Sequence, residues 1–305
     1  ALYNAGAAIF RSTGNSAVSM KVSLIVNIIN FCGNALCVYG LKMGVAGVAV
    51  PTLVSRAVGA LIILSLAARP DYLLRITPRT IFHLEGGTVK SILAIGIPSA
   101  CENSLFQLGR VLVVSMISLF GTVHISANAV ANNLDSVGCI IGNAMCLGMI
   151  TVVGRCIGAQ DFDQAIHYTK KLMRWDYVAQ GLTNAAVLLL LNPLLSLYTL
   201  SPETARLSAE LVWIHAGLSI FLWPMAFVLP NALRAANDVK FTMLVSVVSM
   251  VVWRLGFSQI LCVQLGWGAL GVWWAMIIDW VCRLLCFVIR FKSGAWKKHA
   301  LKTPA

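Results

Sequence analysis

Residues 11–15 read RSTGN and residues 234–238 read RAAND, and each stretch opens a long apolar span. A short turn follows each span, GVAGV at residues 44–48 and GALGV at residues 268–272, before a further apolar span begins. The two copies run in the same direction about 220 residues apart, a repeat typical of transporters built from two similar helical bundles. Because much less than one repeat unit precedes the first copy, we expect the first bundle to be incomplete in this sequence.

The composition is that of a membrane protein. The chain is 59% hydrophobic and 11% charged, with a mean hydropathy of +0.83, whereas about a quarter of the residues in a soluble domain are charged. Apolar stretches of about twenty residues, long enough to cross a bilayer core of roughly 30 Å, recur along the chain. The predicted spans are residues 16–40, 46–67, 92–119, 125–152, 168–191, 208–233, 240–264 and 269–290.

The net charge of +12 indicates membrane topology rather than a nucleic-acid surface. If the short loops alternate between the two sides, nearly all their lysines and arginines fall on one side, and only Lys42 and Arg206 fall on the other. Basic loops of membrane proteins stay in the cytoplasm. We therefore predict a multi-pass protein of the plasma (inner) membrane with a cytoplasmic C-terminus, contacts to membrane lipids and no nucleic-acid partner.

The sequence contains no signature of an enzyme or of a bound cofactor. Its nine cysteines form no C-x-x-C pair, and the metal motif H-E-x-x-H, the nucleophile motif G-x-S-x-G and the phosphate-binding P-loop are absent. We predict no catalytic activity, no metal and no cofactor. Without a nucleotide site of its own, the chain would have to drive uphill transport with an ion gradient.

Several glycine-containing stretches resemble the multidrug and toxic compound extrusion (MATE) family. GIP at residues 96–98, Gly121, ANA at 127–129 and GRCIGA at 154–159, with both copies of the repeat, match the family in order and spacing. The resemblance covers essentially the whole chain and implies an all-α polytopic fold of two six-helix bundles. It also implies export of amphipathic, often cationic, organic compounds in exchange for Na⁺ or H⁺. We expect such a transporter to act as a monomer by alternating access.

The resemblance divides the chain into four parts. Residues 1–68 would be the remainder of the N-terminal bundle, from the end of the family's fourth helix through its sixth, and residues 69–90 a cytoplasmic loop between the bundles. Residues 91–292 would form the C-terminal bundle, the family's helices 7–12. Residues 293–305 would be a basic cytoplasmic tail.

A polar cluster in the first bundle is a candidate ion-coupling and substrate site. Asn30 and Asn34 are four residues apart and so share a helix face, and Thr52 lies on the next predicted helix. The family places a cation-binding acid where this chain has Asn34, which removes a formal charge here. The corresponding residues of the second copy of the repeat are apolar, so the fold does not require polarity at these positions: Trp253, Phe257 and Met276. The alternative is that the amides only hydrogen-bond neighbouring helices.

Glu102, with Asn103 and Gln107 beside it, is the second candidate site for ion coupling or substrate. Some family members use a glutamate at this point together with an acid on the tenth helix, but this chain has no carboxylate between Trp213 and Arg234, so the pair is incomplete. The alternative is a structural ion pair, for which Arg110 is too distant, because eight residues of helix separate the two groups by about 12 Å.

Further charged groups lie within spans, where lipid makes an unpaired charge costly. Asp135 is a candidate for lining a cavity and selecting cationic substrates, or for bonding to the neighbouring amides. Arg254 and Asp279, near the middles of the last two spans, are predicted to form a structural ion pair, with Arg283 one turn beyond Asp279. His215 is interpreted as a packing residue.

Two functions follow from these features. The first is a secondary antiporter that exports amphipathic compounds, with Glu102 and the cluster of Asn30, Asn34 and Thr52 contributing to ion coupling. The alternative is a translocator of a lipid-linked precursor or metabolite with a related two-bundle fold. A wide cavity lined by cations would favour the alternative, because lipid head groups of this kind are anionic.

Overall fold

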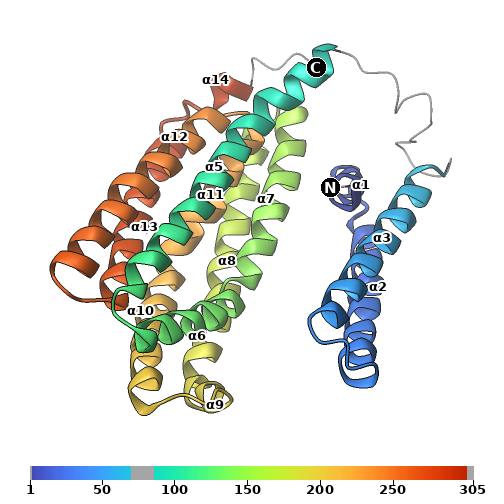
Figure 1. Cartoon of the computed structure of the whole chain (residues 1–305). Coiled ribbons are helices and arrows are strands. Elements are labelled where there is room, and N and C mark those ends of the chain that lie inside the picture. The colour runs from blue at the N-terminus through green and yellow to red at the C-terminus, as the bar shows by residue number, and fades with distance from the viewer. Residues whose placement is uncertain (1, 70–85, 301–305) are drawn as a thin grey trace. The chain divides into compact units, whose positions relative to one another are not determined.

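The computed structural model describes residues 2–69 and 86–300, and every regular element among them is helical (Figure 1). The chain divides into one compact unit that ends at Lys90 and another that begins at Ser91. Most of the predicted loop at residues 69–90 and the last residues of the predicted tail lie outside the described residues. Residues 86–90, assigned to that loop from the sequence, form the first turn of a long helix.

The first unit contains three helices around a small apolar core. They are α1 (Leu2–Ser12), α2 (Ser16–Ala35, continued by a π-helical segment Leu36–Gly40) and α3 (Ala46–Ala67). The turns that separate them contain Gly14 and Gly44, whose φ angles of 86° and 58° are accessible to glycine at little cost. The buried core residues are Ala7, Phe10, Val22, Ile63 and Ala67. At Gly33 a Cβ atom would lie 2.7 Å from Cβ of Pro51, so the missing side chain permits the close approach of α2 and α3.

The second unit is a helical bundle with its own, larger core. Its helices are α5 (Gly86–Ser118), α6 (Thr122–Gly138), α7 (Ile140–Gly158), α8 (Phe162–Leu189), α9 (Leu191–Ser196), α10 (Pro202–Trp223), α11 (Leu229–Ala235), α12 (Val239–Ser249), α13 (Ala269–Lys292) and α14 (Lys297–Ala300). A π-helical segment, Pro224–Val228, joins α10 to α11, and two more, Met250–Gly256 and Gln259–Gln264, continue α12.

The sequence itself explains where two of these helices begin. Asp161 precedes α8 and its carboxylate accepts a hydrogen bond from the backbone N–H of Gln164 at 2.9 Å. Ser201 precedes α10, where its hydroxyl accepts from the N–H of Thr204 at 3.3 Å and Pro202 occupies the first helical position. Such residues satisfy N–H groups that lack a partner within the first turn of a helix.

The predicted span at residues 125–152 is wrong, because the helix breaks within it. Cys139, with φ −93° and ψ 0°, separates α6 from α7. Figure 1 shows α6 lying across one end of the unit while α7 runs along it. The Gly138 carbonyl at the break accepts a hydrogen bond from Nδ2 of Asn184, at 3.4 Å. A side chain inserted beside the backbone in this way is a recognised cause of a sharp bend.

Six helical segments of the described residues are long and apolar enough to cross a membrane, which agrees with a multi-pass protein. They are Ser16–Gly40, Ala46–Ala67, Ile140–Gly158, Pro202–Ala235, Val239–Gln264 and Ala269–Lys292. The predicted spans at 92–119 and 168–191 are helical, but α5 and α8 are less apolar than these six. In α8 the reason is a row of buried polar residues spaced four apart: Asp176, Gln180 and Asn184.

Candidate functional site

A cavity of about 470 Å³ lies entirely within the second unit. Helices α5, α6, α7, α10, α11, α12 and α13 and the π-helical segments contribute its walls. Its lining residues are Glu102, Asn103, Phe106, Arg110, Asn132, Asp135, Ser136, Cys139, Asn143, Cys146, Trp223, Ala226, Phe227, Pro230, Asn231, Arg234, Ser246, Arg254, Met276, Trp280 and Arg283. The volume falls within the range of small-molecule sites, roughly 300–1,000 Å³.

The irregular segment between α10 and α11 shapes one wall of this cavity. Pro224 starts the π-helical segment and Pro230 follows in α11, so that two backbone N–H groups are missing where the helix widens. The carbonyl oxygen of Phe227 accepts from Asn231 Nδ2 at 2.7 Å and from the Cys146 thiol at 3.5 Å. Side chains of α11 and α7 therefore supply hydrogen bonds to this backbone carbonyl beside the cavity.

The predicted site residue Glu102 pairs with an arginine of α11. Its carboxylate lies 2.6 Å from a terminal nitrogen of Arg234, and both side chains are largely buried. The other terminal nitrogen of Arg234 donates to Oδ1 of Asn231 at 3.0 Å. The sequence missed Arg234 as a site residue because its charge was counted with the basic loops, although it opens the second copy of the repeat.

The two polar neighbours of Glu102 point in different directions. Asn103 lines the same cavity and donates from Nδ2 to the Ser99 carbonyl at 2.9 Å. Gln107 instead lies on an exposed part of α5, beside a second hollow that it shares with Arg110. Of the predicted group, Glu102 and Asn103 therefore line one cavity and Gln107 does not.

Asp135 lies in a cluster with Cys139 and His215. One carboxylate oxygen of Asp135 is 2.8 Å from Nε2 of His215 and accepts from the Cys139 thiol at 3.3 Å. One potential ligand atom from each residue lies within 4.8 Å of the others, a spacing that could accommodate a transition-metal ion. His215 packs against the rings of Trp273 and Trp280, as a packing residue would, and in addition makes this polar contact with Asp135.

The predicted ion pair between Arg254 and Asp279 is wrong. Asp279 pairs with Arg283 on the same helix, four residues on, at 2.9 Å, and it also accepts from the hydroxyl of Ser249. Spacing of four residues places Arg283 over Asp279 within α13. Among residues 2–69 and 86–300, Arg254 makes no ion pair, and its Nε is buried without a hydrogen-bond partner.

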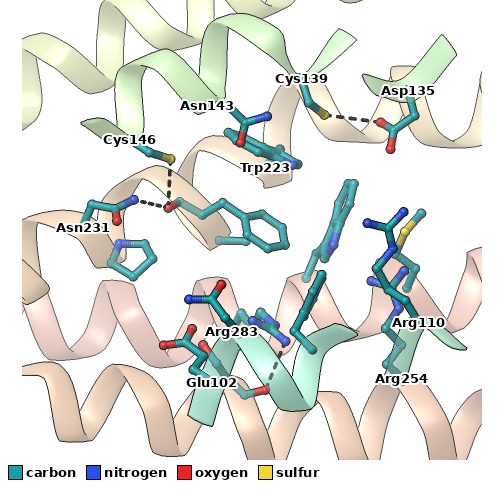
Figure 2. A pocket seen from close by; sticks show the side chains of 18 of the residues that line it. Glu102, Arg110, Asp135, Cys139, Asn143, Cys146, Trp223, Asn231, Arg254 and Arg283 are labelled. Atoms are coloured by element: carbon teal, nitrogen blue, oxygen red, sulfur yellow. Dashed lines mark hydrogen bonds between the residues drawn. The ribbon is translucent and has the colours of Figure 1, made fainter. Parts of the chain in front are cut away.

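Phe106 lies between two arginines in the cavity wall. The guanidinium carbons of Arg254 and Arg283 are 5.7 and 5.8 Å from the centre of its ring. Figure 2 shows Arg110 and Arg254 next to each other at one end of the cavity, with Glu102 toward the other end. Both of those arginines also line a small adjoining cavity. The cavity therefore has a cationic end, with Arg110 and Arg254, and an opposite end where Glu102 pairs with Arg234.

The predicted cluster of the first unit forms a connected hydrogen-bond network. Asn34 Nδ2 donates to Asn30 Oδ1 at 3.0 Å, Asn30 Nδ2 donates to the Thr52 hydroxyl at 3.0 Å, and Thr52 donates to the Val48 carbonyl at 2.7 Å. Asn30 also reaches Ser55 at 3.3 Å, a residue that the sequence missed although it lies three positions after Thr52. Oδ1 of Asn34 is buried with no partner in the described part of the chain.

A helical membrane bundle with an internal repeat and a polar cavity is the architecture of a membrane transporter. The MatE family profile matches residues 98–259, more than half of the chain, and the chain belongs to this family. It is 29% identical over 95% of its length to the "Uncharacterized transporter YisQ" of Bacillus subtilis, and 25% identical over 97% to the "Probable multidrug resistance protein NorM" of Thermotoga maritima. In both cases it covers 64% of the relative.

The fold matches solved structures of the same family. One is described as the outward-facing conformation of a multidrug resistance MATE family transporter of the MOP superfamily; the TM-score is 0.87 at 20% identity. The match covers 97% of this chain and 66% of that one. The predicted all-α polytopic fold is thus confirmed, and the chain spans about two thirds of the length of these relatives.

Proposed function

We propose that the full-length protein is a secondary active antiporter of the plasma membrane that exports amphipathic organic compounds in exchange for H⁺ or Na⁺. The observation that carries this proposal is the contact of 2.6 Å between Glu102 and Arg234 in the wall of the cavity. Intramembrane charges are costly and are kept where they serve an ion or substrate pathway. The cationic nature of the cargo rests on the family resemblance alone.

The ion pair offers a switch that a cation can operate. Ionised Glu102 on α5 attracts Arg234 on α11, which in turn donates to Asn231, one turn beyond the π-helical segment. A proton on Glu102 would remove its charge, and Na⁺ would compete with the guanidinium for the same oxygens. Either event weakens the contact between α5 and α11, so binding of the ion favours a second arrangement of the cavity.

The polar network of the first unit is proposed as a further, neutral site. Asn30, Asn34 and Thr52 are joined by hydrogen bonds and hold no carboxylate. Amide and hydroxyl oxygens bind a cation more weakly than a carboxylate does, because they lack a full charge. We therefore assign ion coupling mainly to Glu102 and a contributing role to these three residues.

Efflux measurements under separately imposed gradients test the proposal. Membrane vesicles that contain the full-length protein would be loaded with amphipathic dyes, and the Na⁺ and pH gradients would be collapsed one at a time. Export that stops with one gradient identifies the coupling ion. Export that is indifferent to both gradients would overturn antiport and favour the second candidate.

The second candidate is a translocator of a lipid-linked precursor or metabolite. The observation that favours it is the charge of the cavity, where four of the six charged lining residues are arginines. Such a protein would move its cargo down a concentration gradient. Vesicles that contain a fluorescent lipid in one leaflet would then show protein-dependent transfer with both ion gradients absent.

The charge asymmetry supports a cytoplasmic C-terminus. The tail contains Lys297 and Lys298, and α13 ends with Arg290 and Lys292. Basic residues close to the end of a span are retained in the cytoplasm. A reporter that fluoresces only in the cytoplasm, fused after the last residue, would be bright under this orientation and dark under the reverse one. We further propose that the protein acts as a monomer, which its mass in nanodiscs would test.

A further inference from the structure

We propose that the cationic end of the cavity, formed by Arg110 and Arg254, binds the acidic group of an amphipathic organic anion. The inference rests on the proposed export function for its physiological meaning, but binding can be measured without transport. It departs from the cationic cargo that the family resemblance implies. The argument depends on which charges of the cavity already have partners.

The two carboxylates that line the cavity are occupied elsewhere. Glu102 contacts Arg234 at 2.6 Å, and Asp135 contacts His215 at 2.8 Å. Asp279, which lies behind the wall, contacts Arg283 at 2.9 Å. These contacts leave Arg110 and Arg254 without an acidic partner within 4 Å in the part of the chain that the structure describes.

The surroundings of Arg254 do not replace a missing anion. Its guanidinium shares the ring of Phe106 with that of Arg283, at 5.7 and 5.8 Å, so two positive charges face one ring. A ring attracts a cation only weakly compared with a carboxylate. Nε of Arg254 is also buried without a hydrogen-bond partner among the described residues. A buried donor of this kind is costly until a ligand accepts its hydrogen.

The geometry defines the chemistry of the ligand. Guanidinium groups present paired N–H donors that match the oxygens of a carboxylate, sulfonate or phosphate. Beside the arginines the wall is apolar and aromatic, with Met276, Trp280 and Phe227. A volume of about 470 Å³ accommodates a compound with an aromatic body and one acidic group.

A competing explanation is that Arg254 moves to pair with Asp279. Oδ2 of Asp279 is also buried without a partner within residues 2–69 and 86–300, so such a movement would satisfy both groups. Arg110 distinguishes the two explanations, because it lines the cavity beside Arg254 but belongs to α5 and is not in contact with Asp279. A ligand site requires both arginines, whereas a structural pair requires only Arg254.

The test compares two probes with the same fluorophore and opposite charge, dansyl-glycine and dansyl-ethyltrimethylammonium. Their binding to the purified full-length protein would be measured by fluorescence anisotropy in nanodiscs of neutral lipid, with no ion gradient. We expect the anion to bind more tightly than the cation. We expect Arg110→Gln and Arg254→Gln each to lower the affinity for the anionic probe by about tenfold, because each removes a charge-assisted contact.

The matched control is Arg206→Gln on α10, which removes an arginine that is 84% exposed and paired with Glu210 outside the cavity. It should leave both affinities unchanged, and thermal unfolding would confirm that every variant is folded. Equal affinity for the two probes, or an unchanged affinity of Arg110→Gln, would overturn the proposal. If the anion fails to bind while gradient-driven dye efflux persists, the antiporter function stands and only this inference falls.

The source of the acidic group is decided by adding phosphatidylglycerol to the nanodiscs. Competition between this lipid and dansyl-glycine would support the cationic site and identify a lipid head group as an occupant. Absence of competition would support the site as one for a free organic anion that enters from the aqueous phase.

Discussion

The polar residues of the two units are organised in different ways. In the first unit, Asn30, Asn34 and Thr52 form a neutral network in which each side chain donates to the next. In the second unit, the cavity is built around ionised groups, with Glu102 and Arg234 in direct contact. Each unit contains one copy of the sequence repeat, so the side chains at corresponding positions can be compared directly.

The corresponding positions of the repeat make this contrast concrete. Asn30 and Asn34 correspond to Trp253 and Phe257, whose rings lie 5.3 Å apart. Thr52 corresponds to Met276, which lines the cavity. The second unit therefore uses these positions as apolar surface and takes its charges from α5, α6, α11, α13 and the π-helical segment Met250–Gly256. We infer that the units have separate tasks, with ion coupling and charged cargo in the second.

The largest expected effect is on coupling, and Glu102→Gln produces it. The substitution keeps the shape of the side chain but removes the charge that attracts Arg234. Because a neutral amide no longer responds to a proton or to Na⁺, we expect gradient-driven efflux to fall by at least about tenfold. Dye efflux from vesicles with equal amounts of the variant and the parent measures this.

Glu210→Gln is the control for that variant. Glu210 pairs with Arg206 at 3.2 Å at an exposed position of α10, so its loss should change neither efflux nor stability to a measurable extent. If Glu102→Gln exports dye at the parent's rate, the ion pair is structural and the coupling site lies elsewhere. Ion coupling could then not be assigned to Glu102 of the second unit.

The second largest effect concerns stability, and Asp279→Asn tests it. Asp279 and Arg283 are both buried, so the substitution leaves a buried guanidinium without its carboxylate. Removal of one member of a buried ion pair typically costs about 3 kcal/mol or more. We expect a clearly lower melting temperature in detergent. The decrease should exceed that caused by any single substitution among the neutral residues of the first unit.

A second substitution distinguishes the two possible partners of Asp279. Because the structure pairs Asp279 with Arg283, the double variant Asp279→Asn with Arg283→Met should recover part of the lost stability. Asp279→Asn with Arg254→Gln should recover none. Rescue by the Arg254 variant instead would show that the two orphaned groups, Nε of Arg254 and Oδ2 of Asp279, pair in the membrane.

The fold was largely predictable from the sequence because lipid imposes strong constraints on each span. Hydropathy located the six most apolar segments and the repeat indicated the class of protein. The failure was the span at 125–152, where both α6 and α7 are apolar enough to be read as one. A tertiary contact between Asn184 and the Gly138 carbonyl lies at the break, and no local pattern contains it.

The candidate site was less predictable because its partners come from different helices. Spacing of four residues correctly placed Asn30 beside Asn34, since that relation is local to one helix. The partners of Glu102 and Asp135 are Arg234 and His215, which are far away in sequence. The wrong pair of Arg254 with Asp279 has the opposite origin: the prediction chose a partner on another helix, whereas the structure pairs Asp279 with Arg283, four residues away on the same helix.

The smallest expected effect comes from Asn34→Leu in the neutral network. The substitution removes the hydrogen bond of 3.0 Å to Asn30 and leaves the link from Asn30 to Thr52 in place. The lost bond lies within α2 and the interhelical bond is kept. Even a hydrogen bond between membrane helices contributes only about 0.6 kcal/mol on average, so stability and efflux should each change by less than about threefold in equilibrium or rate. The comparison with Glu102→Gln in the same efflux assay is decisive for the division of tasks. A loss of coupling as large as that of Glu102→Gln would place an essential ion site in the first unit despite its lack of a carboxylate, since a lost amide bond of this size cannot account for it.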